Sequence, residues 1–243
     1  PVYKPSREEL QLPPGTATLL PVAWLRSRSS CRLFMLDTLG HLAYWTAKTR
    51  GAPAQPQPGK THRLASGVLG MAKVDSETMA YVRNDGGRLY AHSINADGAV
   101  SAPHVVGVAE GVSQVLFAAS SLWRRSFGGC ALLSVDNGSE SWRIISAASH
   151  IEQMERIDLA KGWKGLGLLL QEDDEHYSLI LLSPNQQTIA LYCGGQQRVL
   201  FTTSSAIAKV SFCPMSGLVA ALTSARELLV YSVRLDCMRL QVF

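Results

Sequence analysis

Acidic residues recur in the short polar turns of this 243-residue chain, and carboxylates are well suited to hold a cation or to transfer a proton. Five of them stand at comparable places in hairpin-like segments: Asp37, Asp85, Asp136, Asp173 and Asp174. A fold that brings these turns to one rim would form a ring of carboxylates there. Asp also favours such turns because its side chain hydrogen-bonds to the local backbone, and this structural interpretation is the stronger one.

Other reactive motifs are incomplete. The segment PGKTHR (58–63) contains the Gly-Lys-Thr of a phosphate-binding loop, but Ala54 stands where the first glycine of that motif is required. The histidines have no metal-ligand spacing, and the five cysteines form no Cys-x-x-Cys pair. The sequence therefore predicts no catalytic residue, no metal site and no cofactor, and it identifies no small-molecule ligand.

The stretch SSLWRRSFGG (120–129) combines aromatic and basic residues in a segment of loop-like composition. Trp and Arg are enriched among the residues that dominate protein interfaces, so Trp123, Arg124 and Arg125 are the candidate partner-binding residues. A structural alternative stays open, in which Trp123 and Phe127 fill space between neighbouring sheets while the two arginines face water.

The bulk composition indicates a globular chain. Hydrophobic residues make up 47% and charged residues 17%, which is enough apolar material for a sizeable core. The Lys and Arg residues behind the net charge of +4 are scattered, so a nucleic-acid partner is not expected. No window reaches the roughly 18 apolar residues of a membrane span. The odd number of dispersed cysteines favours a reducing compartment, and we expect a cytoplasmic location.

A repeated hairpin must position all of these residues. Each copy has an apolar strand, a short turn rich in Asp, Asn, Gly or Ser, and a second strand. The copies lie at 36–45, 82–94, 135–145, 171–182 and 223–233. Their second strands are centred on Tyr44, Tyr90, Trp142, Leu179 and Tyr231. The average step between them is about 47 residues, a length typical of blade-type repeats.

Further strands flank the hairpins. An apolar run precedes each one, at 18–25, 68–74, 112–119, 154–160 and 207–213. A more polar strand follows most of them, at 62–66, 104–110, 188–193 and 239–243. Four strands per repeat are typical of a propeller blade, because stacked blades cover the faces that a single sheet leaves exposed. We predict an all-β β-propeller of four-stranded antiparallel blades, in a ring that is closed, incomplete or open.

The last repeat carries a family resemblance. IAKVSFCPMSGLVAALTSARELLVYSVR (207–234) resembles a WD40 blade, through Val210, Phe212, Pro214 and Gly217 in its first half and Leu229, Val230 and Tyr231 in its second. No Trp-Asp dipeptide occurs, so the resemblance is to a divergent WD40-like propeller. It implies an N-terminal extension at 1–17 and a single propeller domain at 18–243.

The resemblance also implies a function. WD40-like proteins mostly bind other proteins without catalysis, so we expect an interaction scaffold or assembly subunit whose partners the sequence does not identify. The alternative is a propeller enzyme or ligand-binding domain that uses a cation held by the rim carboxylates.

Overall fold

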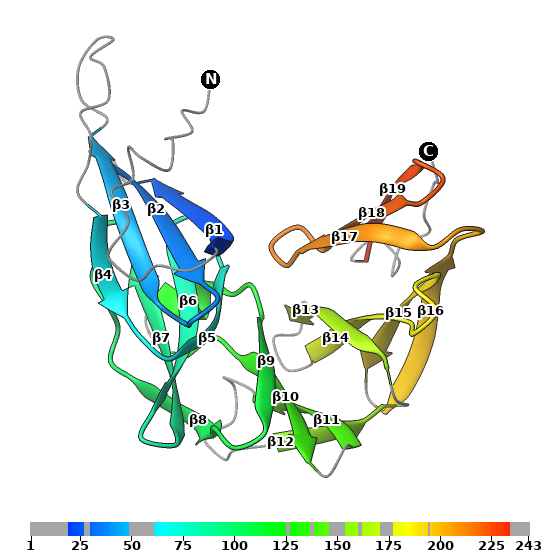
Figure 1. The fold of residues 1–243 in the computed structure, drawn as a ribbon, viewed down its shortest axis with the longest axis horizontal. Coiled ribbons are helices and arrows are strands. Elements are labelled where there is room, and N and C mark those ends of the chain that lie inside the picture. The colour runs from blue at the N-terminus through cyan, green and yellow to red at the C-terminus, as the bar shows by residue number, and fades with distance from the viewer. Residues whose placement is uncertain are drawn as a thin grey trace. The chain divides into compact units, whose positions relative to one another are not determined.

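The computed structural model describes residues 19–26, 30–48, 61–124, 127–136, 139–145, 154–159, 162–170, 177–193 and 195–233. Among these residues are nineteen β-strands and one short 3₁₀ helix, drawn in Figure 1. The strands form five antiparallel sheets in which chain neighbours pair, four sheets with four strands and a fifth with three described strands. Successive blade-like sheets of this kind make an all-β propeller fold, as predicted. The chain divides into two compact units.

The first unit comprises residues 1–110 and 121–127. Its first sheet contains β1 (Leu19–Arg26), β2 (Ser30–Asp37), β3 (Leu42–Lys48) and β4 (Thr61–Ala65). Its second sheet contains β5 (Val68–Lys73), β6 (Thr78–Asp85), β7 (Arg88–Asn95) and β8 (His104–Val108). The 3₁₀ helix η1 (Ser121–Arg124) belongs to the same unit.

Large apolar side chains join the two sheets of the first unit. Phe34 and Leu42 from the first sheet share a buried cluster with Met79 and Ile94 from the second. Met79 and Ile94 are cross-strand partners on β6 and β7, so the hairpin presents them on one face. The guanidinium of Arg32 adds a polar link, because its Nη1 donates a hydrogen bond to the carbonyl of Ala96 beyond β7.

A glycine pair fixes the hairpin between β6 and β7. Asp85 pairs with Arg88 across a two-residue loop, and the loop residues Gly86 and Gly87 have φ angles of 60° and 83°. A two-residue loop with both φ angles positive matches the right-handed twist of the strands, and glycine adopts this conformation without a steric penalty. The sequence Asp-Gly-Gly-Arg therefore sets the register that places the residues of β6 opposite those of β7.

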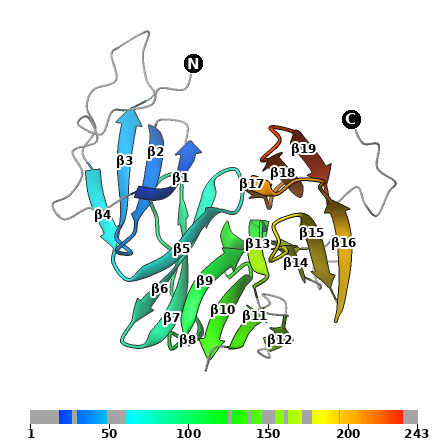
Figure 2. The same ribbon diagram turned by 45° about the vertical axis from the view of Figure 1, so that its right-hand side comes forward.

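The second unit comprises residues 111–120 and 128–243. Its first sheet contains β9 (Val112–Phe117), β10 (Cys130–Asp136), β11 (Ser139–Ile145) and β12 (Met154–Asp158). The next contains β13 (Lys164–Leu170), β14 (Tyr177–Leu182), β15 (Thr188–Cys193) and β16 (Gln196–Thr202). The last contains β17 (Ile207–Cys213), β18 (Leu218–Thr223) and β19 (Leu228–Ser232), shown in orange to red in Figure 2.

Two glycines of β13 allow the sheets of the second unit to approach closely. A Cβ atom on Gly165 would overlap the ring of Trp142 from β11, and one on Gly167 would overlap the ring of Phe212 from β17. Leu168 and Leu169 complete the two faces of β13, each in the buried cluster on its own side. The strand is therefore covered on both faces, as its run of successive apolar residues predicts.

The fourth repeat differs from the prediction by one strand. Residues 154–160 were expected to open that repeat, but Met154–Asp158 pairs with β11 as the outer strand of the preceding sheet. The strand at 165–170 opens the fourth sheet, and 188–193 forms its third strand rather than its last. Gln196–Thr202, which the sequence reading did not assign, is the outer strand. The error arises because β13 and β14 are both apolar throughout, so hydrophobicity does not distinguish their positions.

Candidate functional site

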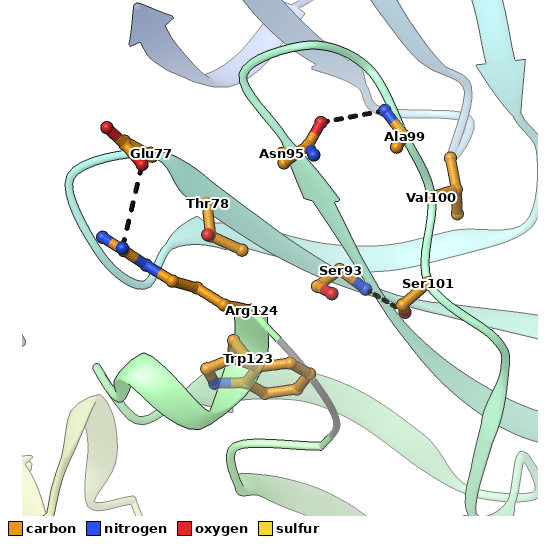
Figure 3. Close-up of a pocket in the computed structure, with 9 residues that line it drawn as sticks. All are labelled: Glu77, Thr78, Ser93, Asn95, Ala99, Val100, Ser101, Trp123 and Arg124. Carbon is orange, nitrogen blue, oxygen red and sulfur yellow. Dashed lines mark hydrogen bonds and ion pairs between the residues drawn. The ribbon is translucent and has the colours of Figure 1, made fainter. Parts of the chain in front are cut away.

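A pocket of about 270 Å³ lies in the first unit, between the β6–β7 hairpin and η1 (Figure 3). Its walls come from the start of β6, the end of β7, the loop that follows β7, and η1. The lining residues are Glu77, Thr78, Ser93, Asn95, Ala99, Val100, Ser101, Trp123 and Arg124. Two of the predicted partner-binding residues, Trp123 and Arg124, therefore lie side by side at this pocket.

The loop after β7 is shaped by its own polar residues. The Asn95 Oδ1 accepts hydrogen bonds from the amides of Asp97 at 3.0 Å and Ala99 at 2.9 Å, which closes a tight turn. Gly98 supports the turn with a φ of 89°, a conformation that glycine adopts readily. The chain then returns beside β7, where the amide of Ser101 donates to the carbonyl of Ser93 at 2.8 Å. Val100 is thereby placed at the pocket, with 42% of its surface exposed.

Trp123 forms a wall of the pocket rather than a projecting side chain. It is 1% exposed, and its ring meets Phe127 edge-on at a centroid distance of 5.1 Å. Phe127 in turn stacks on His104 from β8 at 4.4 Å, so an aromatic stack holds η1 against the second sheet. Burial of Trp123 and Phe127 matches the structural alternative for their side chains. It leaves the partner-binding role of Trp123 as a prediction about the pocket that its ring helps to form.

Arg124 lies at the rim and is 48% exposed. Its Nε donates to the Asp75 carboxylate at 3.0 Å, and its Nη2 approaches Asp75 Oδ1 at 3.5 Å and Ser76 Oγ at 3.3 Å. Glu77 is more distant, with its Oε2 3.8 Å from Nη1 of Arg124. The donors of the guanidinium thus point mainly at the Asp75–Ser76 corner, and Figure 3 shows the side chain extending along the pocket toward Glu77.

Asp75 is the electrostatic partner that holds Arg124 in place. Burial raises the pKa of Asp75, but hydrogen bonds from Arg124 and from the Glu77 amide, together with the nearby Thr78 hydroxyl, hold it below its usual value. Asp75 in turn raises the pKa of Arg124. Both groups therefore remain charged at neutral pH, and the pair is a permanent feature of the rim.

Two polar groups of the pocket keep unused capacity. Thr78 is 2% exposed, and its Oγ1 makes no hydrogen bond of normal geometry with any described part of the chain. The Glu77 carboxylate is 62% exposed, and its closest contact with Arg124 lies beyond hydrogen-bond distance. Figure 3 shows the Thr78 oxygen facing the Arg124 side chain, with the Trp123 ring beyond it. The pocket therefore offers acceptor oxygens to whatever enters it.

The other predicted residues do not join this site. Arg125 lies outside the described residues, as do Asp173, Asp174 and the side chain of Asp136. The Asp37 carboxylate accepts hydrogen bonds from the amides of Leu39 and His41 in its own turn and contacts the His41 ring, as the structural interpretation predicts. Asp85 pairs with Arg83 at 3.1 Å. Within the described residues, no three His, Cys, Asp or Glu side chains group as a metal site would require.

Two of the cysteines that the structure describes, Cys31 and Cys130, are free thiols. Burial strongly raises the pKa of Cys130, and burial also raises that of Cys31 despite the opposing charges of Arg26 and Lys73. A thiol with a raised pKa carries little of the reactive thiolate at neutral pH, so Cys130 and Cys31 behave as packing residues.

Sequence reasoning missed the part of the pocket that comes from the second sheet. Glu77, Thr78 and Ser93 have no motif, and they come together only through the register of β6 and β7. One local signal was present: Asn-Ala-Asp-Gly at 95–98 has the composition of a tight turn, which predicts a return of the chain beside β7.

Comparisons with known proteins support the fold and leave the site unassigned. No protein family matches the sequence, and no curated protein does. A structure of a functionally unknown protein from Desulfotomaculum acetoxidans is similar, with a TM-score of 0.51 and 10% identity over 93% of this chain and 69% of that one. A chain in the S. cerevisiae complex of Dbp5 with Nup159, Gle1, IP6 and ADP is also similar, with a TM-score of 0.50 and 13% identity. The match covers 88% of this chain and 65% of that one. Such similarities establish the fold alone.

None of the described helical structure is long and apolar enough to cross a membrane.

Proposed function

We propose that this protein is a non-catalytic interaction scaffold or assembly subunit that binds a protein partner at the pocket of the first unit. The observation that carries the proposal is the rim, where an exposed cation (Arg124), an exposed anion (Glu77) and an exposed aliphatic side chain (Val100) surround a cavity with a Trp wall. Such a mixture of Arg, Trp and apolar contacts is typical of protein interfaces. Rigid strands and short turns hold the rim in position, as recognition without a large ordering cost requires.

The WD40-like resemblance supports the same function. The segment that carries it coincides with β17, β18 and β19, so its strand pattern is a real blade-like sheet. We propose on this basis that residues 18–243 act as one divergent WD40-like domain. The free thiols of Cys31 and Cys130 support a reducing compartment and hence the cytoplasm.

A pull-down from native cell extract tests the proposal. The tagged chain is compared with Val100→Arg and with Glu77→Lys, and bound proteins are identified and quantified by mass spectrometry. Trp123 itself is unsuitable as a first target, because truncating a buried Trp costs about 3–5 kcal/mol of stability and confuses folding with binding. Val199→Arg is the matched control, since Val199 is an exposed valine on β16 of the other unit.

The proposal expects one stoichiometric partner that the parent chain and Val199→Arg retain and that both pocket variants lose. Retention of the same partner by all four proteins would place the interface elsewhere. Thermal unfolding of each variant confirms that the loss reflects the surface rather than the fold.

A further inference from the structure

We infer that the pocket receives a lysine side chain of the protein partner, with its ammonium group between Glu77 and Thr78. This inference rests on the proposed function and adds the chemistry of the residue that is recognised. It follows from which polar groups of the pocket are already engaged and which are not.

The guanidinium and several other donors at the pocket are engaged. The Arg124 guanidinium is directed at Asp75 and Ser76, and the amide of Ser93 donates to the Ser101 hydroxyl at 2.9 Å. The Ser101 hydroxyl donates to the carbonyl of Ala102 at 3.1 Å. A ligand that needs donors therefore finds few at this site. Besides the exposed Asn95 side-chain amide and the Ser93 hydroxyl, the groups with free capacity are oxygens, which favours a ligand that supplies protons.

The acceptors with free capacity are Glu77 and Thr78. The Glu77 carboxylate stands at the open side, and the buried Thr78 hydroxyl has no normal hydrogen bond among the described residues. The Thr78 hydroxyl helps to lower the pKa of Asp75, so its proton is turned toward that carboxylate and its lone pairs stay available. A buried oxygen with unused acceptor capacity gains from a donor on the ligand. Both oxygens accept from an ammonium group, which carries three donors and no acceptor.

The charge at the rim favours a cation. Asp75 neutralises Arg124 through a 3.0 Å contact, which leaves the carboxylate of Glu77 as the unbalanced charge of the group. A carboxylate ligand would have to displace Asp75 from Arg124, whereas a cation binds the Glu77 carboxylate without breaking an existing hydrogen bond. Charge-assisted hydrogen bonds of this type are roughly twice as strong as neutral ones.

The shape of the pocket favours lysine over arginine. The Trp123 wall offers apolar surface to an unbranched methylene chain, and the volume of about 270 Å³ accommodates one such side chain. The inner acceptor is a single hydroxyl rather than a fork of two oxygens. A guanidinium with five donors in a plane would leave most of them unpaired there, while a compact ammonium is satisfied by few contacts.

Titration with two short peptides tests the inference. The probes are acetyl-Ala-Lys-Ala-amide and the same peptide with the lysine acetylated on Nε, each added to ¹⁵N-labelled protein and followed by amide and indole NMR shifts. We expect saturable shifts at Thr78, Ser93 and the Trp123 indole with the lysine peptide, and at least about tenfold weaker binding of the acetylated peptide, because it lacks the charge-assisted hydrogen bond. Glu77→Gln should weaken the lysine peptide by a similar factor.

Asp97→Asn is the matched control for Glu77→Gln. It removes one negative charge from an exposed position of the neighbouring loop that does not line the pocket, and it should leave the titration almost unchanged. Equal binding of both peptides, or equal losses in Glu77→Gln and Asp97→Asn, would overturn the inference. The absence of shifts with either peptide would also overturn it. The pull-down result is independent, because a partner can still be lost on Val100→Arg when no lysine enters the pocket.

Discussion

The sheets of the first unit meet through large side chains, whereas those of the second unit meet where aromatic rings lie over glycines of one strand. Phe34, Met79 and Ile94 occupy the first kind of contact. Gly165 beneath Trp142 and Gly167 beneath Phe212 form the second kind. Each arrangement packs two sheets closely. In the first unit large side chains fill the space between the sheets, and in the second unit the glycines let the aromatic rings approach the backbone.

This difference in sheet packing explains where a site can form. Both faces of β13 are covered by apolar clusters, so this strand of the second unit has no face left for polar groups. The second sheet of the first unit is also buried on both faces, with Met79 and Ile94 on one face and Ala80 and Ala91 on the other. The polar residues Thr78 and Ser93 lie on the face of Ala80, toward the start of β6 and the end of β7, and they line the pocket beside η1. The candidate site therefore lies where polar side chains replace apolar ones along that face.

The largest effect is expected from Phe34→Ala in the first unit. Phe34 is fully buried, and removing its ring leaves a cavity between the two sheets. Such truncations cost about 3–5 kcal/mol of unfolding free energy. Urea unfolding followed by tryptophan fluorescence measures the loss. Leu39→Ala, at an exposed turn position of the same unit, should change stability little. A similar small loss for Phe34→Ala would show that the sheets do not depend on this cluster.

Gly167→Ala breaks the other kind of contact. The new methyl group would overlap the ring of Phe212, and overpacking of this type costs about 1–3 kcal/mol. The φ angle of Gly167 is not in the left-handed region, so the cost is steric and a smaller partner should relieve it.

A double-mutant cycle measures that relief. Phe212→Leu alone should destabilise the second unit, and combined with Gly167→Ala it should recover part of the loss, since residues in contact couple rather than add. Additive losses would mean that Phe212 does not lie over the glycine. The same pair of changes should leave the Phe34 cluster unaffected.

Much of this contrast was accessible from the sequence, but not all of it. The Asp-Gly-Gly-Arg turn at 85–88 predicts its hairpin because only certain residues adopt the loop conformation. The uninterrupted apolar run at 165–170 predicts a strand buried on both faces. Its place within the sheet could not be predicted, because β13 and β14 are equally apolar and a pattern with period two carries no information on strand order.

The site was only partly predictable for a related reason. Trp123 and Arg124 were selected from their residue types, and both line the pocket. Their surroundings depend on contacts across 49 residues of sequence, such as Arg124 with Asp75, and these follow from tertiary packing rather than from local pattern. The burial of Trp123 also depends on a stack with Phe127 and His104, which no spacing rule predicts.

Lowering the pH should change the stability of the two units differently, by less than the substitutions above. His92 on β7 is buried and stacked on Tyr81, and burial lowers its pKa below 6.5 although the Ser101 backbone opposes this shift. The unfolded chain then binds a proton before the folded chain does. Stability should fall as the pH drops below about 6.5 and level off below the folded-state pKa.

His92→Phe keeps an aromatic ring at this position and removes the titration. The variant should lose the part of the pH dependence that falls just below pH 6.5, measured by urea unfolding between pH 5 and 8. His92 lies in the first unit, so the pH effect that His92→Phe removes should appear in probes of that unit. An unchanged pH profile in His92→Phe would assign the dependence to another group.

The smallest effect is expected from two surface ion pairs, one chosen from each unit. Arg124→Met removes the partner of Asp75, which is 13% exposed, whereas Arg156→Met removes the partner of Asp158, and both members of that pair are mostly exposed. Exposed pairs contribute little because water and salt screen them.

We expect the pKa of Asp75 to rise in Arg124→Met, since burial then acts with less opposition. NMR titration of the Asp75 side-chain carbonyl measures this rise. The lowered folded-state pKa of Asp75 stabilises the protein at pH values above the pKa of the unfolded chain, and this stabilisation is lost as the pH falls. Arg124→Met should therefore converge with the parent protein in acid. A larger loss of stability in Arg156→Met than in Arg124→Met would contradict the view that partial burial makes the pocket pair the stronger of the two.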